Sequence, residues 1–194
     1  MAKLYFRYGA MGSSKTVNAL IVRYNYKEKG QNAIILKPKK ENRDGEKIIR
    51  SRIGLEAECL FVEDFLADYT NSAVDFSKID AIIVDEVQFL TTKQVDLLSD
   101  IVDFENIPVI CYGLRTDFQG LLFDGAKRLM ELSDVIEEIP TVCWCGRRAQ
   151  FNARFDENGI VRNGEQFKLG ANSEYVSLCR KHFKTGETIP ANND

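Results

Sequence analysis

Short apolar runs recur along the first 140 residues, separated by stretches in which apolar positions follow a helical period. The runs are LYFRY, NAIILKP, CLFV, IDAIIVDE, IPVICYG and VIEEI. Nearly continuous apolar strands are typical of a parallel sheet that is buried on both faces, with helices as the crossovers. The pattern therefore predicts an α/β fold with a mostly parallel sheet and helices on both faces.

Two segments between these runs have clear helix boundaries. One helix is predicted over residues 16–29, because Gly30 follows it and glycine is a common stop signal. A second is predicted from residue 91 to about residue 102, where Thr91 and Gln94 have the spacing of a capping box. Both helices would serve as crossovers between parallel strands.

The pattern changes after residue 140. The segment TVCWCGRRAQFNARFDENGIVRNGEQFKLGANSEYVSLCRKHF is rich in glycine and asparagine, and a DENG turn separates two strand-like pieces. We therefore expect an α/β domain over residues 1–140 and a small, loop-rich domain over residues 141–194. The final residues, TGETIPANND, are expected to form a solvated tail.

The segment YGAMGSSKT, residues 8–16, matches a phosphate-binding loop except that Ser14 replaces the second glycine. It lies between a predicted strand and a predicted helix, where backbone N–H groups converge on an anion. We expect Lys15 to neutralise the terminal phosphate oxygens of ATP and the Thr16 hydroxyl to ligate Mg²⁺. The loop residues predicted to bind ATP are Gly9, Ala10, Met11, Gly12, Ser13, Ser14, Lys15 and Thr16.

A magnesium nucleotide site also needs a carboxylate at the end of a buried strand near the loop. The segment AIIVDEVQF supplies four apolar residues followed by Asp85 and Glu86. We expect Asp85 to orient Mg²⁺ and Glu86 to accept a proton from the group that attacks the terminal phosphate. The alternative is that both carboxylates only cap the strand in water. Val87 and Gln88 complete the segment predicted to bind ATP.

The five cysteines fall into two groups. Cys59 and Cys111 lie in apolar runs, where small core residues are expected. The other three lie near the only histidine, and these four predicted zinc ligands are Cys143, Cys145, Cys179 and His182. Three sulfurs and one imidazole predict a closed, tetrahedral structural zinc site. An odd number of cysteines does not favour a disulfide framework.

Composition limits the partners that the chain can have. A net charge of −3 does not suit a protein whose main task is to hold a nucleic-acid backbone. No apolar stretch approaches the roughly 18 residues of a membrane span. Lys3 and Arg7 interrupt the N-terminal segment MAKLYFRYGA, so we expect no secretory signal and a cytoplasmic location.

The segments GAMGSSKT, DEVQF, GLRTDFQG and CWC…EYVSLCRKH together resemble thymidine kinase of the type shared by bacteria and vertebrate cytosol, from residue 3 to about residue 183. The resemblance implies ATP-dependent phosphorylation of the 5′-hydroxyl of thymidine or deoxyuridine. It also implies a P-loop NTPase-type α/β domain, a small C-terminal zinc-binding lasso domain and a homotetramer. Glu86 matches the general base of the family. The segment ENR at residues 41–43 matches the acidic-x-Arg segment of the family only loosely, so its role stays open.

The resemblance also implies a pocket for the nucleobase. The residues that match it are Met11, Phe89, Leu114, Phe118 and Tyr175. A base needs flat apolar walls for stacking, and the three aromatic residues among these lie near predicted strand ends or in loops, where ligands usually bind. Taken singly, each of them is more often a core residue than a ligand-binding one.

Two other functions remain open from the sequence. One is a different P-loop kinase, such as a nucleoside monophosphate kinase with a zinc-bearing lid, although the metal unit here is terminal and such lids lie mid-chain. The other is a zinc-ribbon, nucleic-acid-binding ATPase. Its basic surface would be limited to Arg147, Arg148, Arg180 and Lys181. The acidic balance of the chain does not favour that function.

Overall fold

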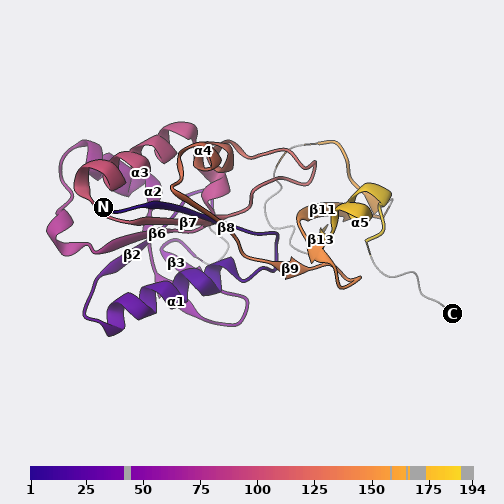
Figure 1. Ribbon diagram of the computed structural model, residues 1–194, viewed down its shortest axis with the longest axis horizontal. Helices are drawn as coiled ribbons and strands as arrows, with labels where there is room; N and C mark the ends of the chain where they lie inside the picture. Colours follow the sequence, from indigo (N-terminus) through magenta and orange to yellow (C-terminus); the bar gives the residue numbers. More distant parts are fainter. Residues whose placement is uncertain (42–44, 158, 165, 167–173, 189–194) are drawn as a thin grey trace.

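A six-stranded sheet forms the centre of the molecule (Figure 1). The computed structural model describes residues 1–41, 45–157, 159–164, 166 and 174–188. The strands follow the order β5-β2-β6-β7-β1-β8, and every neighbouring pair is parallel. The predicted α/β class with a mostly parallel sheet is thus confirmed. The strands are β1 (Leu4–Tyr8), β2 (Ala33–Lys37), β5 (Leu60–Phe61), β6 (Ala81–Val84), β7 (Val109–Gly113) and β8 (Val135–Glu138).

Helices cover both faces of this sheet. Successive residues of β6 point to opposite faces, because side chains alternate along a strand. Ile82 and Val84 join the core under α2, α3 and α4, whereas Ala81 and Ile83 join the core under α1. No described helix combines the length and apolarity needed to cross a membrane. The helices of this part are α1 (Lys15–Glu28), α2 (Val62–Thr70), α3 (Thr92–Glu105) and α4 (Asp124–Leu132), with short 3₁₀ turns η1 (Phe76–Lys78) and η2 (Val87–Phe89).

The two predicted helices are confirmed, with small differences at their ends. The helix predicted over residues 16–29 is α1, which begins and ends one residue earlier. The predicted capping box at the start of α3 is present: Thr91 Oγ1 accepts from the Gln94 N–H at 3.2 Å, and Gln94 Oε1 accepts from the Thr91 N–H at 2.8 Å. α3 continues to Glu105, three residues further than predicted.

The strand expected over CLFV is shorter than predicted. Only Leu60 and Phe61 form β5, and Val62 begins α2. Glu63 and Asp64 follow in the first turn of α2, where negative charges stabilise the N-terminus of a helix. The preceding hairpin was not predicted and consists of β3 (Ile48–Arg50) and β4 (Glu56–Glu58).

After residue 140 the chain forms a small unit of antiparallel strands and one helix, on the right in Figure 1. It has its own hydrophobic cluster, which includes Cys143, Cys179 and Phe183. β11 and β12 flank the predicted DENG turn, of which Asn158 lies outside the described residues. The domain boundary at residue 140 stays a prediction. The elements are β9 (Thr141–Val142), β10 (Arg148–Ala149), β11 (Phe151–Asp156), β12 (Gly159–Ile160), β13 (Tyr175–Leu178) and α5 (Arg180–Thr185).

Candidate functional site

The predicted phosphate loop connects β1 to α1. A Cβ atom at Gly9 would lie 2.3 Å from Ser13 Oγ and 2.4 Å from the Ile139 carbonyl oxygen, so the close packing requires glycine. Lys15 is buried, and its Nζ donates to the carbonyl oxygens of Gly9 and Ala10 at 3.0 Å each. The loop therefore closes around an ammonium group that has no acidic partner in direct contact among the described residues.

Ser14, the residue that replaces the expected glycine, has a left-handed backbone. Its φ is 61° and its ψ is 30°, at the N-cap of α1. Gly12, two residues earlier, also has a positive φ of 76°. A side chain in this conformation costs roughly 1–2 kcal/mol relative to glycine. The serine therefore preserves the loop geometry at a cost in backbone strain.

Ser14→Gly is expected to raise the free energy of unfolding by roughly 1 kcal/mol and to leave kcat within a few-fold, because glycine relieves the strain. Chemical denaturation and steady-state kinetics measure both effects. Ser72→Gly is the matched control, since Ser72 has a φ of 55° and lies outside the cavity described below. It should show the gain in stability without any change in activity. A loss of activity in Ser14→Gly as large as that in Lys15→Ala would contradict this account.

The acidic pair lies at the end of β6, close to the phosphate loop. β7 lies between β6 and β1 in the sheet, but all three strands end at the same edge because they are parallel. At this edge Thr16 Oγ1 donates to Asp85 Oδ2 at 2.8 Å. Burial, followed by repulsion from Glu86, raises the pKa of Asp85 to about 7. A hydroxyl and a carboxylate oxygen fit the hard oxygen ligands that Mg²⁺ prefers, and a bound cation would favour the ionised carboxylate.

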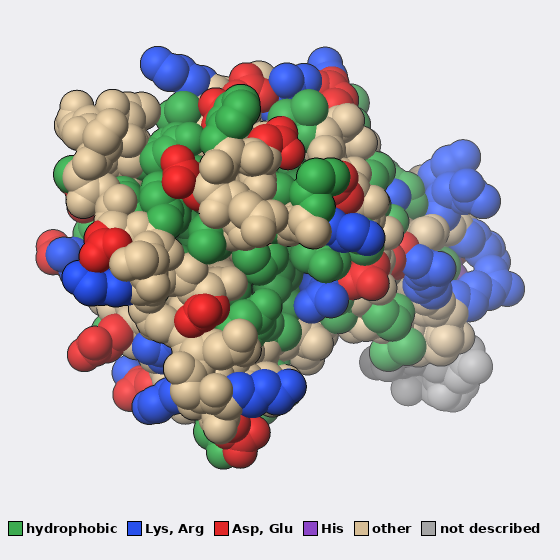
Figure 2. All heavy atoms as spheres, turned by 60° about the vertical axis from the view of Figure 1, so that its left-hand side comes forward, with side chains coloured by type: hydrophobic (Ala, Val, Ile, Leu, Met, Phe, Trp, Pro, Cys, Tyr) green, Lys and Arg blue, Asp and Glu red, His purple; other side chains and the backbone are tan. Residues whose placement is uncertain are grey.

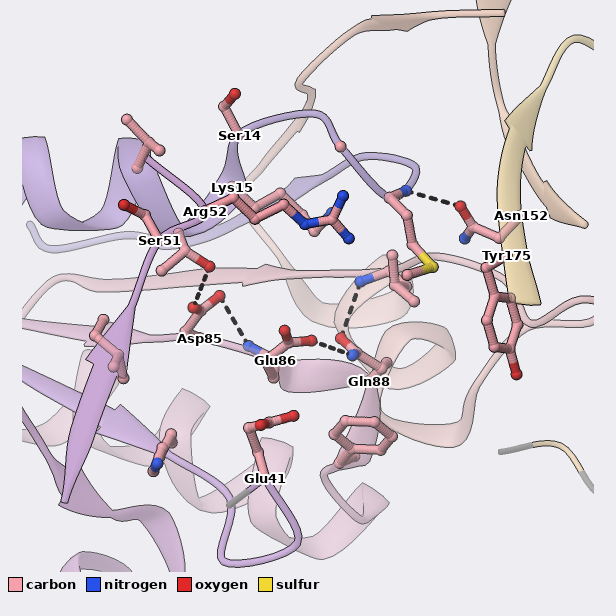
Figure 3. Close-up of a pocket in the computed structure, with 18 of the residues that line it drawn as sticks. Ser14, Lys15, Glu41, Ser51, Arg52, Asp85, Glu86, Gln88, Asn152 and Tyr175 are labelled. Atoms are coloured by element: carbon pink, nitrogen blue, oxygen red, sulfur yellow. Dashed lines mark hydrogen bonds between the residues drawn. The ribbon is translucent and has the colours of Figure 1, made fainter. Parts of the chain in front are cut away.

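Glu86 is held by its backbone and by Gln88 (Figure 3). Its φ of 54° is unusual for a residue other than glycine, and its N–H donates to Asp85 Oδ1 at 3.0 Å. Gln88 Nε2 donates to Glu86 Oε2 at 2.5 Å, while Gln88 Oε1 accepts from the Leu114 N–H at 2.9 Å. Strained backbone of this kind is concentrated at functional sites. The arrangement fixes the Glu86 carboxylate at the cavity.

One cavity of about 690 Å³ brings most of the predicted site together. This volume is in the usual range for small-molecule sites. Among the described lining residues are the predicted phosphate and magnesium ligands Lys15, Thr16 and Asp85, the predicted base Glu86, and all five predicted nucleobase contacts Met11, Phe89, Leu114, Phe118 and Tyr175. Gly12, Ser14 and Gln88 line it as well. Gly9, Ala10, Ser13 and Val87 do not, and Val87 is fully buried in the main core.

The aromatic walls of the cavity rest on ordered contacts. Phe89 packs edge-on against Phe123, with ring centroids 6.4 Å apart. Phe118 lies 3.9 Å below the Arg154 guanidinium, measured to the ring centroid. The loop that carries Leu114 and Phe118 is held by Asp117, whose carboxylate accepts from the N–H groups of residues 119 and 121. Each of the two aromatic rings therefore has a neighbouring side chain that supports its position in the wall.

The C-terminal unit reaches the phosphate loop at Met11. The Met11 N–H donates to Asn152 Oδ1 at 2.7 Å, and Ser177 Oγ donates to the Met11 carbonyl oxygen at 2.5 Å. Figure 3 shows the first of these bonds beside Tyr175. Asn152 and Ser177 are not among the predicted site residues. Asn152 lies in β11, which also contains charged residues, whereas Ser177 stands between apolar neighbours in β13. Glu41 is buried and lines the cavity, whereas residues 42 and 43 lie outside the described residues.

The four predicted zinc ligands form a cluster. Their ligand atoms all lie within 4.8 Å of one another. Cys143 Sγ is 3.4 Å from His182 Nδ1, and Cys145 Sγ is 3.9 Å from Cys179 Sγ. Tetrahedral Zn²⁺ requires about 3.6 Å between a sulfur and a nitrogen ligand and about 3.8 Å between two sulfurs. The donor set and its spacing therefore fit a structural zinc ion.

Neighbouring groups orient the His182 ring within this cluster. Trp144 stacks on it with ring centroids 4.2 Å apart, and the Trp144 indole N–H donates to the Glu187 carbonyl oxygen at 3.2 Å. His182 Nε2 lies 3.6 Å from a Glu187 carboxylate oxygen. A carboxylate near the second ring nitrogen is common at metal-binding histidines, where it fixes the ring so that the other nitrogen faces the metal. Cys59 is buried in the core under α1 and Cys111 in the core under α2, α3 and α4, as predicted.

Comparisons with known proteins identify the family of the chain. The family model described as thymidine kinase matches residues 2–183. A thymidine kinase of Mannheimia succiniciproducens is 44% identical over 187 residues, covering 95% of this chain and 96% of that protein. Those of Rhodopirellula baltica and Haemophilus influenzae are 43% and 42% identical over the same length, covering 95% of this chain and 89% and 97% of those proteins. The chain therefore belongs to the thymidine kinase family.

Proposed function

We propose that the chain transfers the terminal phosphoryl group of ATP to the 5′-hydroxyl of thymidine, and of deoxyuridine. The observation that carries this proposal is that one cavity combines Lys15, the carboxylates Asp85 and Glu86, and apolar walls suited to a base. Family membership supports thymidine as the acceptor. It also favours this function over a nucleoside monophosphate kinase or a zinc-ribbon ATPase.

The positions of the side chains support the following roles in this proposal. Glu86 accepts the proton of the 5′-hydroxyl while the 5′-oxygen of the nucleoside forms a bond to the terminal phosphorus of ATP. The bond between that phosphorus and the bridging oxygen breaks, and the oxygen leaves with ADP. Lys15 binds the terminal phosphate oxygens, and the other predicted loop residues that line the cavity complete the ATP contacts together with Gln88. Thr16 and Asp85 would hold Mg²⁺, which supplies charge neutralisation at the phosphates when bound.

The nucleoside occupies the part of the cavity next to the C-terminal unit. Phe89, Phe118 and Tyr175 provide aromatic walls, and Met11 and Leu114 complete the apolar surface around the base. The small difference between thymidine and deoxyuridine is one methyl group, which is worth only about 1–3 kcal/mol in an apolar pocket. Use of deoxyuridine therefore accompanies use of thymidine. A homotetramer in the cytoplasm belongs to the same proposal and rests on family membership.

The zinc ion acts as a structural element for nucleoside binding in this proposal. Cys179 directly follows β13, which carries Tyr175 and Ser177. Four protein ligands leave no position for a reacting water. Zinc therefore takes no part in phosphoryl transfer and fixes the strand that supports Met11 and the nucleoside.

Removing zinc with a chelator, or replacing Cys145 with serine, is expected to weaken thymidine binding and activity by about tenfold or more. The reason is that the residues of the C-terminal unit that contact the nucleoside lose the support of the metal site. A fluorescent ATP analogue should still bind, since the phosphate ligands lie in the α/β domain. Calorimetry and fluorescence titration measure the two affinities, and added Zn²⁺ should restore thymidine binding to the chelated protein. Joint loss of both affinities, with circular dichroism showing a folded α/β domain, would contradict this division of roles.

Nucleoside-dependent release of ADP tests the proposed function against its alternatives. Thymidine should stimulate ADP release, whereas single-stranded DNA and thymidine monophosphate should not. Figure 2 shows Lys and Arg side chains gathered on the projecting part at the right, so the DNA arm is a necessary comparison. Stimulation by DNA in place of thymidine would favour the zinc-ribbon ATPase.

A further inference from the structure

The hairpin β3–β4 presents an arginine, Arg52, to the phosphate end of the cavity (Figure 3). The turn that carries it is closed by Ser51, whose N–H donates to the Leu55 carbonyl oxygen at 2.7 Å and whose Oγ accepts from the Leu55 N–H at 3.0 Å. Gly54, with a φ of 86°, completes the turn. Ser51 is buried, so the turn has a defined position at the rim of the cavity.

Two arginines of this hairpin differ in their surroundings. Arg50 pairs across the hairpin with Glu56, at 2.9 Å from Nε and 2.8 Å from a terminal guanidinium nitrogen to the same carboxylate oxygen. Within the described residues, the Arg52 guanidinium has no hydrogen bond and no ion pair. Arg50 is thus a structural residue of the hairpin, while the five N–H donors of Arg52 are available to a ligand.

Arg52 shares its end of the cavity with Lys15. Burial lowers the pKa of Lys15, and the charges of Glu86 and Asp85 oppose that shift. The charge of Arg52 adds to the lowering, so the two cations repel each other in the free protein. An anion bound between Lys15 and Arg52 would attract both cations and offset the repulsion between them. A phosphate group has the charge and the geometry for a guanidinium and an ammonium group at once.

We propose that Arg52 is a catalytic residue that contacts the transferred phosphoryl group and stabilises the charge on its oxygens during transfer. This assignment rests on the proposed function. Phosphoryl transfer is catalysed mainly by positioning and by cations at the oxygens where charge develops, and arginine is a common source of that charge. Lys15 binds the phosphates from the loop, and Arg52 approaches them from the hairpin.

The test compares Arg52→Ala, Arg52→Lys and the hairpin control Arg50→Ala in steady-state assays with saturating thymidine and MgATP. Arg52→Ala should lower kcat by about 10², the usual effect of removing one charge-stabilising donor. Arg52→Lys should keep part of the activity, because the charge remains and the planar donor group is lost. Guanidinium ion at millimolar concentration should restore part of the activity of Arg52→Ala.

Binding measurements separate this role from a structural one. The Kd of thymidine and of a non-hydrolysable ATP analogue should change by less than about threefold in Arg52→Ala, since the contact strengthens in the transition state. Arg50→Ala should keep kcat within the same factor. Near-normal kcat in Arg52→Ala, or an equal loss in Arg50→Ala without guanidinium rescue, would overturn the assignment. Absence of thymidine-dependent turnover in the unmodified protein would overturn the proposed function and this assignment with it.

Discussion

Replacing Glu86 with glutamine is expected to lower kcat for thymidine by about 10² or more, with the affinity for ATP nearly unchanged. The amide has the shape of the carboxylate, and its oxygen can still accept the hydrogen bond from Gln88 Nε2. The pair of residues therefore keeps its geometry and loses only the ability to take up a proton. Steady-state kinetics give kcat, and titration with an ATP analogue gives the affinity.

Glu86→Asp is the matched control for this experiment. It keeps a proton acceptor but withdraws the carboxylate by one methylene, so its kcat should lie between those of the unmodified protein and Glu86→Gln. Thermal unfolding of each variant shows whether the backbone at the positive φ of Glu86 tolerates the change. Near-full turnover of Glu86→Gln with thymidine would show that Glu86 is not the base.

Loss of the Lys15 ammonium group is expected to abolish ATP-dependent transfer, with a fall in kcat/KM for ATP of about 10³ or more. Lys15 is buried at the phosphate end of the cavity and is tied to the loop through two backbone carbonyl groups. Lys15→Ala removes both the charge and these hydrogen bonds.

Lys15→Met also lacks the charge and both hydrogen bonds, which all belong to Nζ, but it keeps an apolar stem of similar length. It therefore separates loss of the ammonium group from loss of side-chain packing. Both variants should be inactive, and circular dichroism with thermal unfolding should show a folded protein for Lys15→Met at least. Turnover of Lys15→Met within about tenfold of the unmodified protein would contradict the role of this lysine in phosphate binding.

Short sequence motifs indicated much of the candidate site. The phosphate loop, the carboxylates after an apolar strand and each of the two pairs of predicted zinc ligands consist of residues that are close in sequence, so each could be proposed from the sequence alone. The six apolar runs likewise all became strands of one sheet. The run CLFV gave a shorter strand than predicted, because Glu63 and Asp64 favour a helix directly after it.

Contacts between distant segments were not predictable in the same way. Asn152 and Ser177 bind Met11 across 141 and 166 residues of sequence, and neither belongs to a motif. Arg52 lies in a hairpin turn whose position depends on how residues between β2 and α2 fold back over the sheet. The insertion of β7 between β1 and β6 also follows from topology, which apolar periodicity does not determine.

Isotope transfer from ATP shows directly whether the protein moves the terminal phosphoryl group to thymidine. The protein is incubated with thymidine, Mg²⁺ and ATP that carries ¹⁸O in its terminal phosphate, and the products are analysed by mass spectrometry. We expect labelled thymidine 5′-monophosphate in equal amount to ADP, and no labelled nucleotide from 5′-deoxythymidine, which lacks the acceptor hydroxyl. Label recovered as inorganic phosphate at a rate independent of the nucleoside would contradict the proposed function.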